Sequence, residues 1–182
     1  NKYIDRYRIM EQGRADLPVY WDSAAGSSPV EIGLDKIRYF PDCSTPNYML
    51  VAGLDLSQPA KKANVSTYLG SGENVYVSKS ALYAAVSHYQ AAYPLPKGIN
   101  GIMPRPLPAQ SSTTIYKFSL NAGNASYKAA GKIPGTVLNQ FSMDAYNGYL
   151  RVATTTGDIW RFDEGTSKNN VYVLDGNLKI TG

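Results

Sequence analysis

Val51-Ala52-Gly53-Leu54-Asp55-Leu56, Ile115-Tyr116-Lys117-Phe118-Ser119-Leu120 and Val171-Tyr172-Val173-Leu174-Asp175-Gly176 are three versions of one pattern. Each begins with apolar and aromatic residues that favour strands and ends in a turn-forming or polar residue. They start at positions 51, 115 and 171, so the pattern recurs at roughly 60 residues. A second register supports this repeat, because Leu82-Tyr83-Ala84-Ala85 matches Leu150-Arg151-Val152-Ala153.

Strand-like segments, most of them four to nine residues long, surround these repeats, and helical periodicity is nearly absent. The predicted strands cover 47–56, 64–69, 74–78, 81–86, 114–120, 125–133, 140–144, 149–154, 170–174 and 178–181. A repeat of this length with four strands per unit is typical of β-propeller blades, since solenoid repeats are shorter. We therefore predict an all-β fold, a partial β-propeller of antiparallel four-stranded blades. Ten strands amount to about two and a half blades.

Turn residues separate the predicted strands where hairpins require them. Asn147-Gly148 lies between two tyrosines and predicts a type I′ turn, in which both central residues take positive φ. Gly70-Ser71-Gly72-Glu73-Asn74 is the predicted junction between one blade and the next. We treat 1–182 as one propeller fragment, with a less distinctive segment at 1–36 that folds back on the half-blade, where Ile32, Ile37 and Tyr39 serve as strand material.

A proline-rich segment interrupts the pattern between residues 89 and 112. It contains Pro94, Pro96, Pro104, Pro106 and Pro108, and each proline removes a donor from a strand ladder. We predict an insertion loop between the second and third strands of one blade. It is either a stiff decorative loop or, through Pro104-Arg105-Pro106-Leu107-Pro108, a presented polyproline II recognition segment.

Composition excludes several classes of protein. The net charge of +4 comes from scattered Lys and Arg, whereas a nucleic-acid site needs a basic stripe or patch, so we expect no nucleic-acid partner. No apolar run approaches the ~18 residues of a spanning helix. With one cysteine, Cys43, and one histidine, His88, the chain has no intrachain disulfide and no zinc cage of the usual type. We predict no metal and no cofactor.

The blade junction Leu69 to Ser78 and the strand Thr113 to Leu120 resemble those of a family of bacterial and archaeal exported proteins with a C-terminal β-propeller domain distantly related to WD-40 repeats. The longest match runs from Gly131 to Thr155, and Asn169 to Asp175 closes it. The resemblance implies an extracytoplasmic protein, secreted or membrane-anchored, and implies no particular chemistry. It also makes us expect that this chain is part of a longer protein.

Polar positions on the first strands of the two predicted blades are the candidate ligand-binding residues, because first strands line the channel of a propeller. Together with an aromatic residue in a later loop they are Asn74, Tyr76, Ser78, Gln140, Ser142, Asp144 and Trp160. The set carries one charge, and no Ser-His-acid or Gly-x-Ser-x-Gly pattern accompanies it. We predict no catalytic residue.

These residues favour a non-enzymatic extracytoplasmic scaffold that binds protein or polysaccharide through blade loops. The alternative is a fragment of a propeller hydrolase or lyase whose channel site is completed by blades outside this chain. Self-association is a further expectation, because an incomplete propeller leaves apolar blade faces and a strand edge uncovered.

Overall fold

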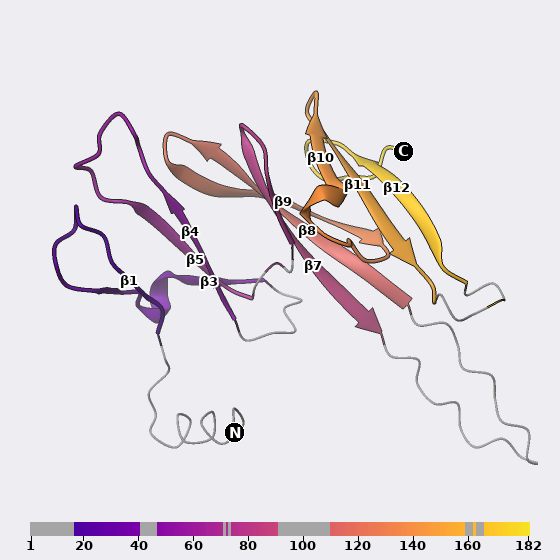
Figure 1. Cartoon of the computed structure of the whole chain (residues 1–182), viewed down its shortest axis with the longest axis horizontal. Helices are drawn as coiled ribbons and strands as arrows, with labels where there is room; N and C mark the ends of the chain where they lie inside the picture. Colours follow the sequence, from indigo (N-terminus) through magenta and orange to yellow (C-terminus); the bar gives the residue numbers. More distant parts are fainter. Residues whose placement is uncertain are drawn as a thin grey trace, which may run out of the picture. The chain divides into compact units, whose positions relative to one another are not determined.

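The computed structural model describes residues 17–40, 47–70, 72, 74–90, 110–158, 162 and 166–182 (Figure 1). The chain divides into two compact units, Asn1–Gly70 and Ser71–Gly182, and the division falls inside the predicted blade junction. Among the described residues the regular structure is strands with two short 3-10 helices and no α-helix, which confirms the all-β class. Trp160 and Cys43 lie outside the described residues.

Unit 1 contains the predicted half-blade. Strand β4 (Tyr48–Gly53) pairs antiparallel with β5 (Asn64–Leu69), close to the predicted bounds. Ile37 and Tyr39 supply strand material as predicted, because β3 (Ile37–Tyr39) joins the sheet in the order β3-β5-β4, whereas Ile32 lies just beyond a short strand. Strand β3 pairs parallel with the central strand β5, so β4 remains an edge of this sheet. Before β3 come the short strands β1 (Val19–Tyr20) and β2 (Val30–Glu31) and the 3-10 turn η1 (Leu34–Lys36).

Unit 2 begins with a complete blade. Its strands lie in sequence order in one antiparallel sheet: β6 (Asn74–Val77), β7 (Ala81–Gln90), β8 (Gln110–Asn121) and β9 (Asn124–Pro134). Strand β9 contains one extra residue, since Lys117 pairs with Ala129 and Phe118 pairs with Tyr127. The bulge leaves Lys128 without a ladder position and lets the Tyr127 ring meet Phe118 edge-on, with ring centroids 6.1 Å apart.

The proline-rich insertion is shorter than predicted. The ladder between β7 and β8 continues through His88 and Tyr89 to a final pair, Gln90 with Gln110. Residues 89–90 and 110–112 are therefore strand residues, and all five prolines fall in 91–109, outside the described residues. The strands extend beyond their apolar residues because Ser and Gln at the strand ends still pair through their backbones.

The second blade has three strands, β10 (Met143–Tyr146), β11 (Tyr149–Thr156) and β12 (Lys168–Leu174). The predicted fourth strand is reduced to one bridge between Ile180 and Leu174, with backbone hydrogen bonds linking Thr181 and Gly182 to Val173. The first strand also starts later than predicted. Residues Gln140–Ser142 form the 3-10 turn η2, in which the Asn139 side chain accepts a hydrogen bond from the Phe141 N–H.

The core of unit 2 lies between its two blades. Alternate residues of β11 are buried, namely Leu150, Val152 and Thr154, as period-two patterning requires. They pack with residues from one face of the first blade and from the blade connection. The cluster comprises Ala81, Tyr83, Ala85, Ile115, Ile133, Val137, Met143, Leu150, Val152, Leu174 and Leu178.

Gly131 marks the tightest approach between the blades. A Cβ built there would lie 2.2 Å from the Leu178 carbonyl oxygen and 2.7 Å from the Leu178 Cβ. Backbone cannot yield as a flexible side chain can, so only glycine lets β9 and the β12 turn pack this closely.

We predict that Gly131→Ala destabilises the protein by about 1–3 kcal/mol through overpacking, although Gly→Ala in unstrained backbone ordinarily stabilises slightly. Gly176→Ala is the matched control, since its Cβ would meet nothing nearer than 3.9 Å. Urea denaturation of both variants measures the difference. Equal stability of the two proteins would show that the blades are not in this contact.

The β10–β11 hairpin turn is the predicted type I′ turn. Asn147 has φ 48° and Gly148 φ 83°, so both central residues are in the left-handed region. A Cβ at Gly148 would meet nothing within 4 Å, which means that any cost of substitution comes from backbone conformation alone.

We predict that Gly148→Val lowers the free energy of unfolding by about 1–2 kcal/mol, because a β-branched residue resists the left-handed conformation. Gly148→Asn should cost much less, since asparagine tolerates positive φ. Thermal unfolding of the pair tests the turn. A valine variant as stable as the asparagine variant would mean that this turn takes another form.

Candidate functional site

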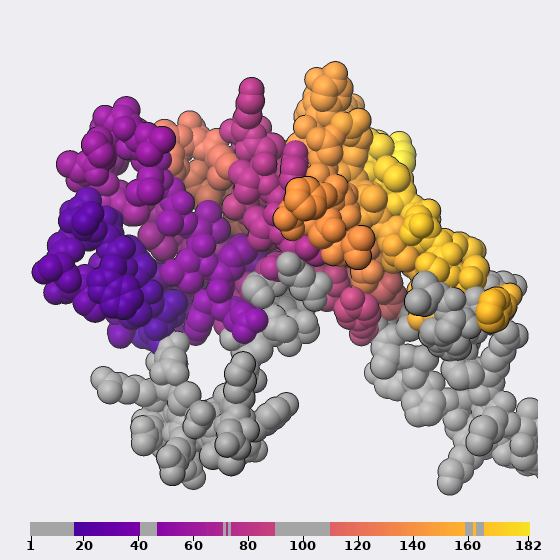
Figure 2. Space-filling model, in the orientation of Figure 1, coloured from indigo at the N-terminus to yellow at the C-terminus, as the bar shows by residue number. Residues whose placement is uncertain are grey.

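Two cavities open at opposite ends of the unit 2 sheets. The first, here called the hairpin-end cavity, has a volume of about 510 Å³ and lies at the turns that join first to second strands. Figure 2 shows the two turns, β6–β7 in magenta and β10–β11 in orange, standing next to each other with a hollow between them. Its lining consists of Tyr76, Val77, Ser78, Lys79, Ser80, Tyr83, Lys117, Ala145, Tyr146, Asn147, Gly148 and Tyr149.

Strand pairing fixes the inner wall of this cavity. Tyr76 of β6 and Lys117 of β8 flank Tyr83 of β7 in one row across the sheet. The rings of Tyr76 and Tyr83 stack with centroids 5.9 Å apart, and the Lys117 ammonium lies 5.8 Å from the Tyr83 centroid. Burial, with a smaller effect of Tyr76, raises the pKa of Tyr83, so this phenol is neutral at physiological pH.

Hydrogen bonds tie the same wall to the second blade. The Ala145 N–H donates to the Tyr76 hydroxyl over 3.0 Å, and the Lys117 ammonium donates to the Gly176 carbonyl over 3.0 Å. Ser78 closes its turn by bonding both the N–H and the carbonyl of Ala81. These contacts hold the polar groups in place without a ligand.

Positive charge dominates the hairpin-end cavity. Among the described residues, its lining contains Lys79 and Lys117 and no carboxylate. The Lys117 charge acts on Asp175, whose carboxylate accepts the N–H groups of Asn177 and Lys179. The Lys179 N–H, then that of Asn177 and the Lys179 and Lys117 charges hold the Asp175 pKa below its usual range. That carboxylate is thus bonded within its own turn and also interacts with the charge of Lys117.

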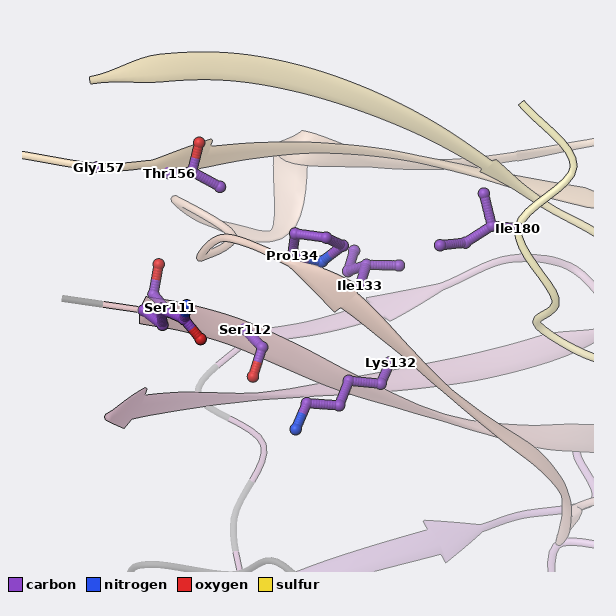
Figure 3. A pocket seen from close by; sticks show the side chains of 9 residues that line it. Ser111, Ser112, Lys132, Ile133, Pro134, Thr156, Gly157 and Ile180 are labelled. Atoms are coloured by element: carbon purple, nitrogen blue, oxygen red, sulfur yellow. The ribbon is translucent and has the colours of Figure 1, made fainter. Parts of the chain in front are cut away.

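The second cavity, the loop-end cavity, has a volume of about 680 Å³ and lies where β8 begins and β11 ends (Figure 3). Ile133 and Ile180 point toward each other across it with Pro134 beside them, while Lys132 extends away from this apolar group. The other lining residues are Gln110, Ser111, Ser112, Thr156 and Gly157. They offer hydroxyl, amide and backbone groups around an apolar floor.

The predicted first-strand residues do not gather in one ligand site. Tyr76 and Ser78 line the hairpin-end cavity. Asn74 instead donates to the Val137 carbonyl over 3.3 Å, which joins the blades. Asp144 forms an ion pair with Arg151 on the neighbouring strand, and both side chains are about half exposed. Gln140 and Ser142 lie in the η2 turn and not on a first strand, because the chain needs that turn to enter β10.

Sequence reasoning missed Lys79, Tyr83, Lys117, Tyr146 and Tyr149 as residues of one cavity. A signal was present, because the turns of neighbouring blades lie at the same end and tyrosines flank Asn147-Gly148. Tyr83 and Lys117, however, lie inside strands and carry no such local signal. Only the cross-strand register shows that they share a row with Tyr76.

His88 takes part in a simple hydrogen bond. Its Nε2 lies 3.1 Å from the Thr114 hydroxyl across the β7–β8 ladder. Within the described part of the chain, no group of three His, Cys, Asp or Glu side chains could hold a metal ion. The same residues form no helix that is long and apolar enough to cross a membrane.

Antiparallel sheets of up to four strands, stacked face to face and following one another along the chain, are blades of a β-propeller. The comparisons agree with this architecture. The β-propeller domain family model matches residues 1–182, and the chain belongs to that family.

Two archaeal relatives align with part of the chain. An uncharacterized protein of Methanocaldococcus jannaschii is 57% identical over 70 residues, which cover 38% of this chain and 10% of the relative. An uncharacterized protein of Archaeoglobus fulgidus is 46% identical over 70 residues, with the same coverage. The aligned region thus spans about a tenth of each relative. No solved structure matches the chain significantly.

We predict that His88→Ala costs about 1 kcal/mol of stability, the usual size of one neutral hydrogen bond, and less than ~2 kcal/mol. A double-mutant cycle with Thr114→Val, measured by urea denaturation, isolates the bond. A larger loss, or a coupling near zero between the two residues, would contradict this simple pairing.

Proposed function

We propose that the protein is a non-enzymatic binding scaffold that works outside the cytoplasm and binds a protein or a polysaccharide through its blade loops. One observation carries the proposal. Both long connections between second and third strands leave unit 2 at the loop-end cavity.

The strand bounds show that both connections start or end at residues of this cavity. The chain leaves β7 at Gln90 and returns at Gln110, and it leaves β11 at Thr156 and returns at Lys168. Gln110 and Thr156 both line the loop-end cavity. Loops anchored at fixed points on a rigid sheet are the usual place for recognition.

The chemistry of the loop-end cavity suits reversible binding. An apolar floor with a few hydroxyl and amide groups at its rim provides contact area together with orientation. Among the described residues of its lining, Lys132 is the one ionisable side chain. General acid–base catalysis uses positioned proton donors and acceptors, so this lining favours binding over hydrolysis.

The location outside the cytoplasm has a different support. The stretch from Gly131 to Thr155 resembles exported proteins whose propellers are distantly related to WD-40 repeats. The 57% identity to the Methanocaldococcus protein shows that a closely similar sequence occurs in an archaeon.

The proposal predicts that removing the 91–109 connection abolishes binding and spares the fold. Because Gln90 and Gln110 are a ladder pair, a two-residue Asn-Gly turn can join them directly. The probes are xylan, mannan and chitin oligosaccharides and a phage-displayed peptide library, assayed for saturable binding. The matched control replaces Ala122-Gly123 by Asn-Gly at the opposite end of the sheet.

We expect one of these probes to bind the parent protein and the control but not the shortened variant. The melting temperature of the shortened variant should stay within a few degrees of that of the parent. Retained binding by the shortened variant would contradict the proposal. So would the absence of any binding probe, or the release of cleaved saccharide, which would favour the hydrolase or lyase alternative.

A further inference from the structure

We infer that the hairpin-end cavity is a second binding site, which takes an anionic saccharide such as a polymer of uronic acid. This inference goes beyond the proposed function, because the cavity lies at the other end of the sheets from the blade loops. Lys117 and Ser111 are separated by six residues of β8, or about 20 Å of strand.

The first argument is charge. Lys79 and Lys117 line the cavity without a carboxylate among the described lining residues, and a cleft lined by one sign of charge concentrates ligands of the other sign. Two carboxylates lie outside this lining. Asp144 is paired with Arg151, and Asp175, on which the Lys117 charge acts, offsets at most one of the two positive charges, so the cavity keeps a net positive charge.

The second argument is the donor capacity of the two amines. A lysine ammonium has three N–H donors, and Lys117 uses one of them on the Gly176 carbonyl. That bond fixes the ammonium against the Tyr83 ring and leaves its remaining donors for a ligand. Lys79 stands in the exposed β6–β7 turn at the rim of the same cavity.

The third argument is the combination of tyrosines with short polar side chains. Tyr146 and Tyr149 flank the β10–β11 turn and are 62% and 48% exposed, so they present ring surface to a ligand. The C–H face of a sugar can pack on such rings, and Ser80 and Asn147 in the lining offer polar groups to its hydroxyls. A peptide has fewer hydroxyl groups than a saccharide to bond to this polar rim.

Preorganisation completes the case. Tyr76 is bonded to the Ala145 N–H, Ser78 is bonded to Ala81, and both lie on or beside strands of the scaffold. The volume of about 510 Å³ falls within the range of ordinary ligand sites, roughly 300–1,000 Å³. The site therefore needs little ordering when a ligand arrives.

Calorimetric titration with oligogalacturonate tests the site. The control ligand is the same oligomer with methyl-esterified carboxylates, which keeps the sugar rings and removes the charge. We expect saturable binding of the acid form, weakened by added salt, and at least tenfold weaker binding of the ester.

Variants locate the site. Lys79→Gln changes an exposed turn residue, so it leaves the fold intact, and we expect it to raise the Kd about tenfold, as Lys117→Gln should also do. Lys132→Gln, at the loop-end cavity, is the matched control and should leave binding unchanged. Tyr149→Ala should weaken both forms of the oligomer alike, because its ring contacts the sugar face.

Three results would overturn the inference: no binding of the acid form, an equal loss in Lys132→Gln, or displacement by poly-glutamate as effective as by the oligomer. The last would show an acidic peptide site instead. The variant that lacks 91–109 separates the two proposals, because it should lose its loop-end probe and still bind oligogalacturonate.

Discussion

The close packing of one blade on the next is the constraint on which the rest of unit 2 depends. Ile115 and Ile133 from the first blade and Leu150 and Leu174 from the second are each at most 1% exposed in a single cluster. Such packing requires every inward position of β8, β9, β11 and β12 to match its neighbours in volume. Both cavities exist only where this packing ends, at the turns on one side and at the strand termini on the other.

Hydrogen bonds from both blades hold the segment that connects them. The Thr113 hydroxyl donates to the Gly135 carbonyl over 2.8 Å, and the Thr154 hydroxyl donates to the Pro134 carbonyl over 2.9 Å. Thr136 and Thr155 exchange two backbone bonds. The connection is thus held from both sheets, which satisfies buried backbone groups that no ladder reaches. Polar residues near this seam form hydrogen bonds that join the two blades. Asn74 is one of them, and for this reason it bonds to Val137 instead of facing a channel.

Local patterns predicted most of the fold and little of the site. The strand at 64–69 and the turn at Asn147-Gly148 follow from apolar alternation and from the φ preferences of two residues, and both are chemical properties of a few neighbours. The η2 turn and the pairing of Gln90 with Gln110 depend on where the backbone must go in three dimensions, and polar sequence conceals them. Lys117 reads as an outward strand residue in the sequence. Its place over Tyr83 depends on the register between β7 and β8. The two residues are 34 positions apart, so no local sequence pattern predicts that they meet.

The bulge in β9 lets the strand hold one extra residue without changing the sheet face on which its other side chains lie. Side chains alternate with a period of two, so in a regular strand one inserted residue would exchange the faces of everything beyond it. With Lys128 in place, Tyr127 lies on the face of Phe118 while Ile133 points into the seam. Loss of Lys128 alone would leave these pairs intact and make β9 a regular strand, whereas loss of a residue between Ala129 and Ile133 would turn Ile133 away from the seam. The bulge is therefore the place where β9 can change its length by one residue without a compensating change in the Asn121–Asn124 turn.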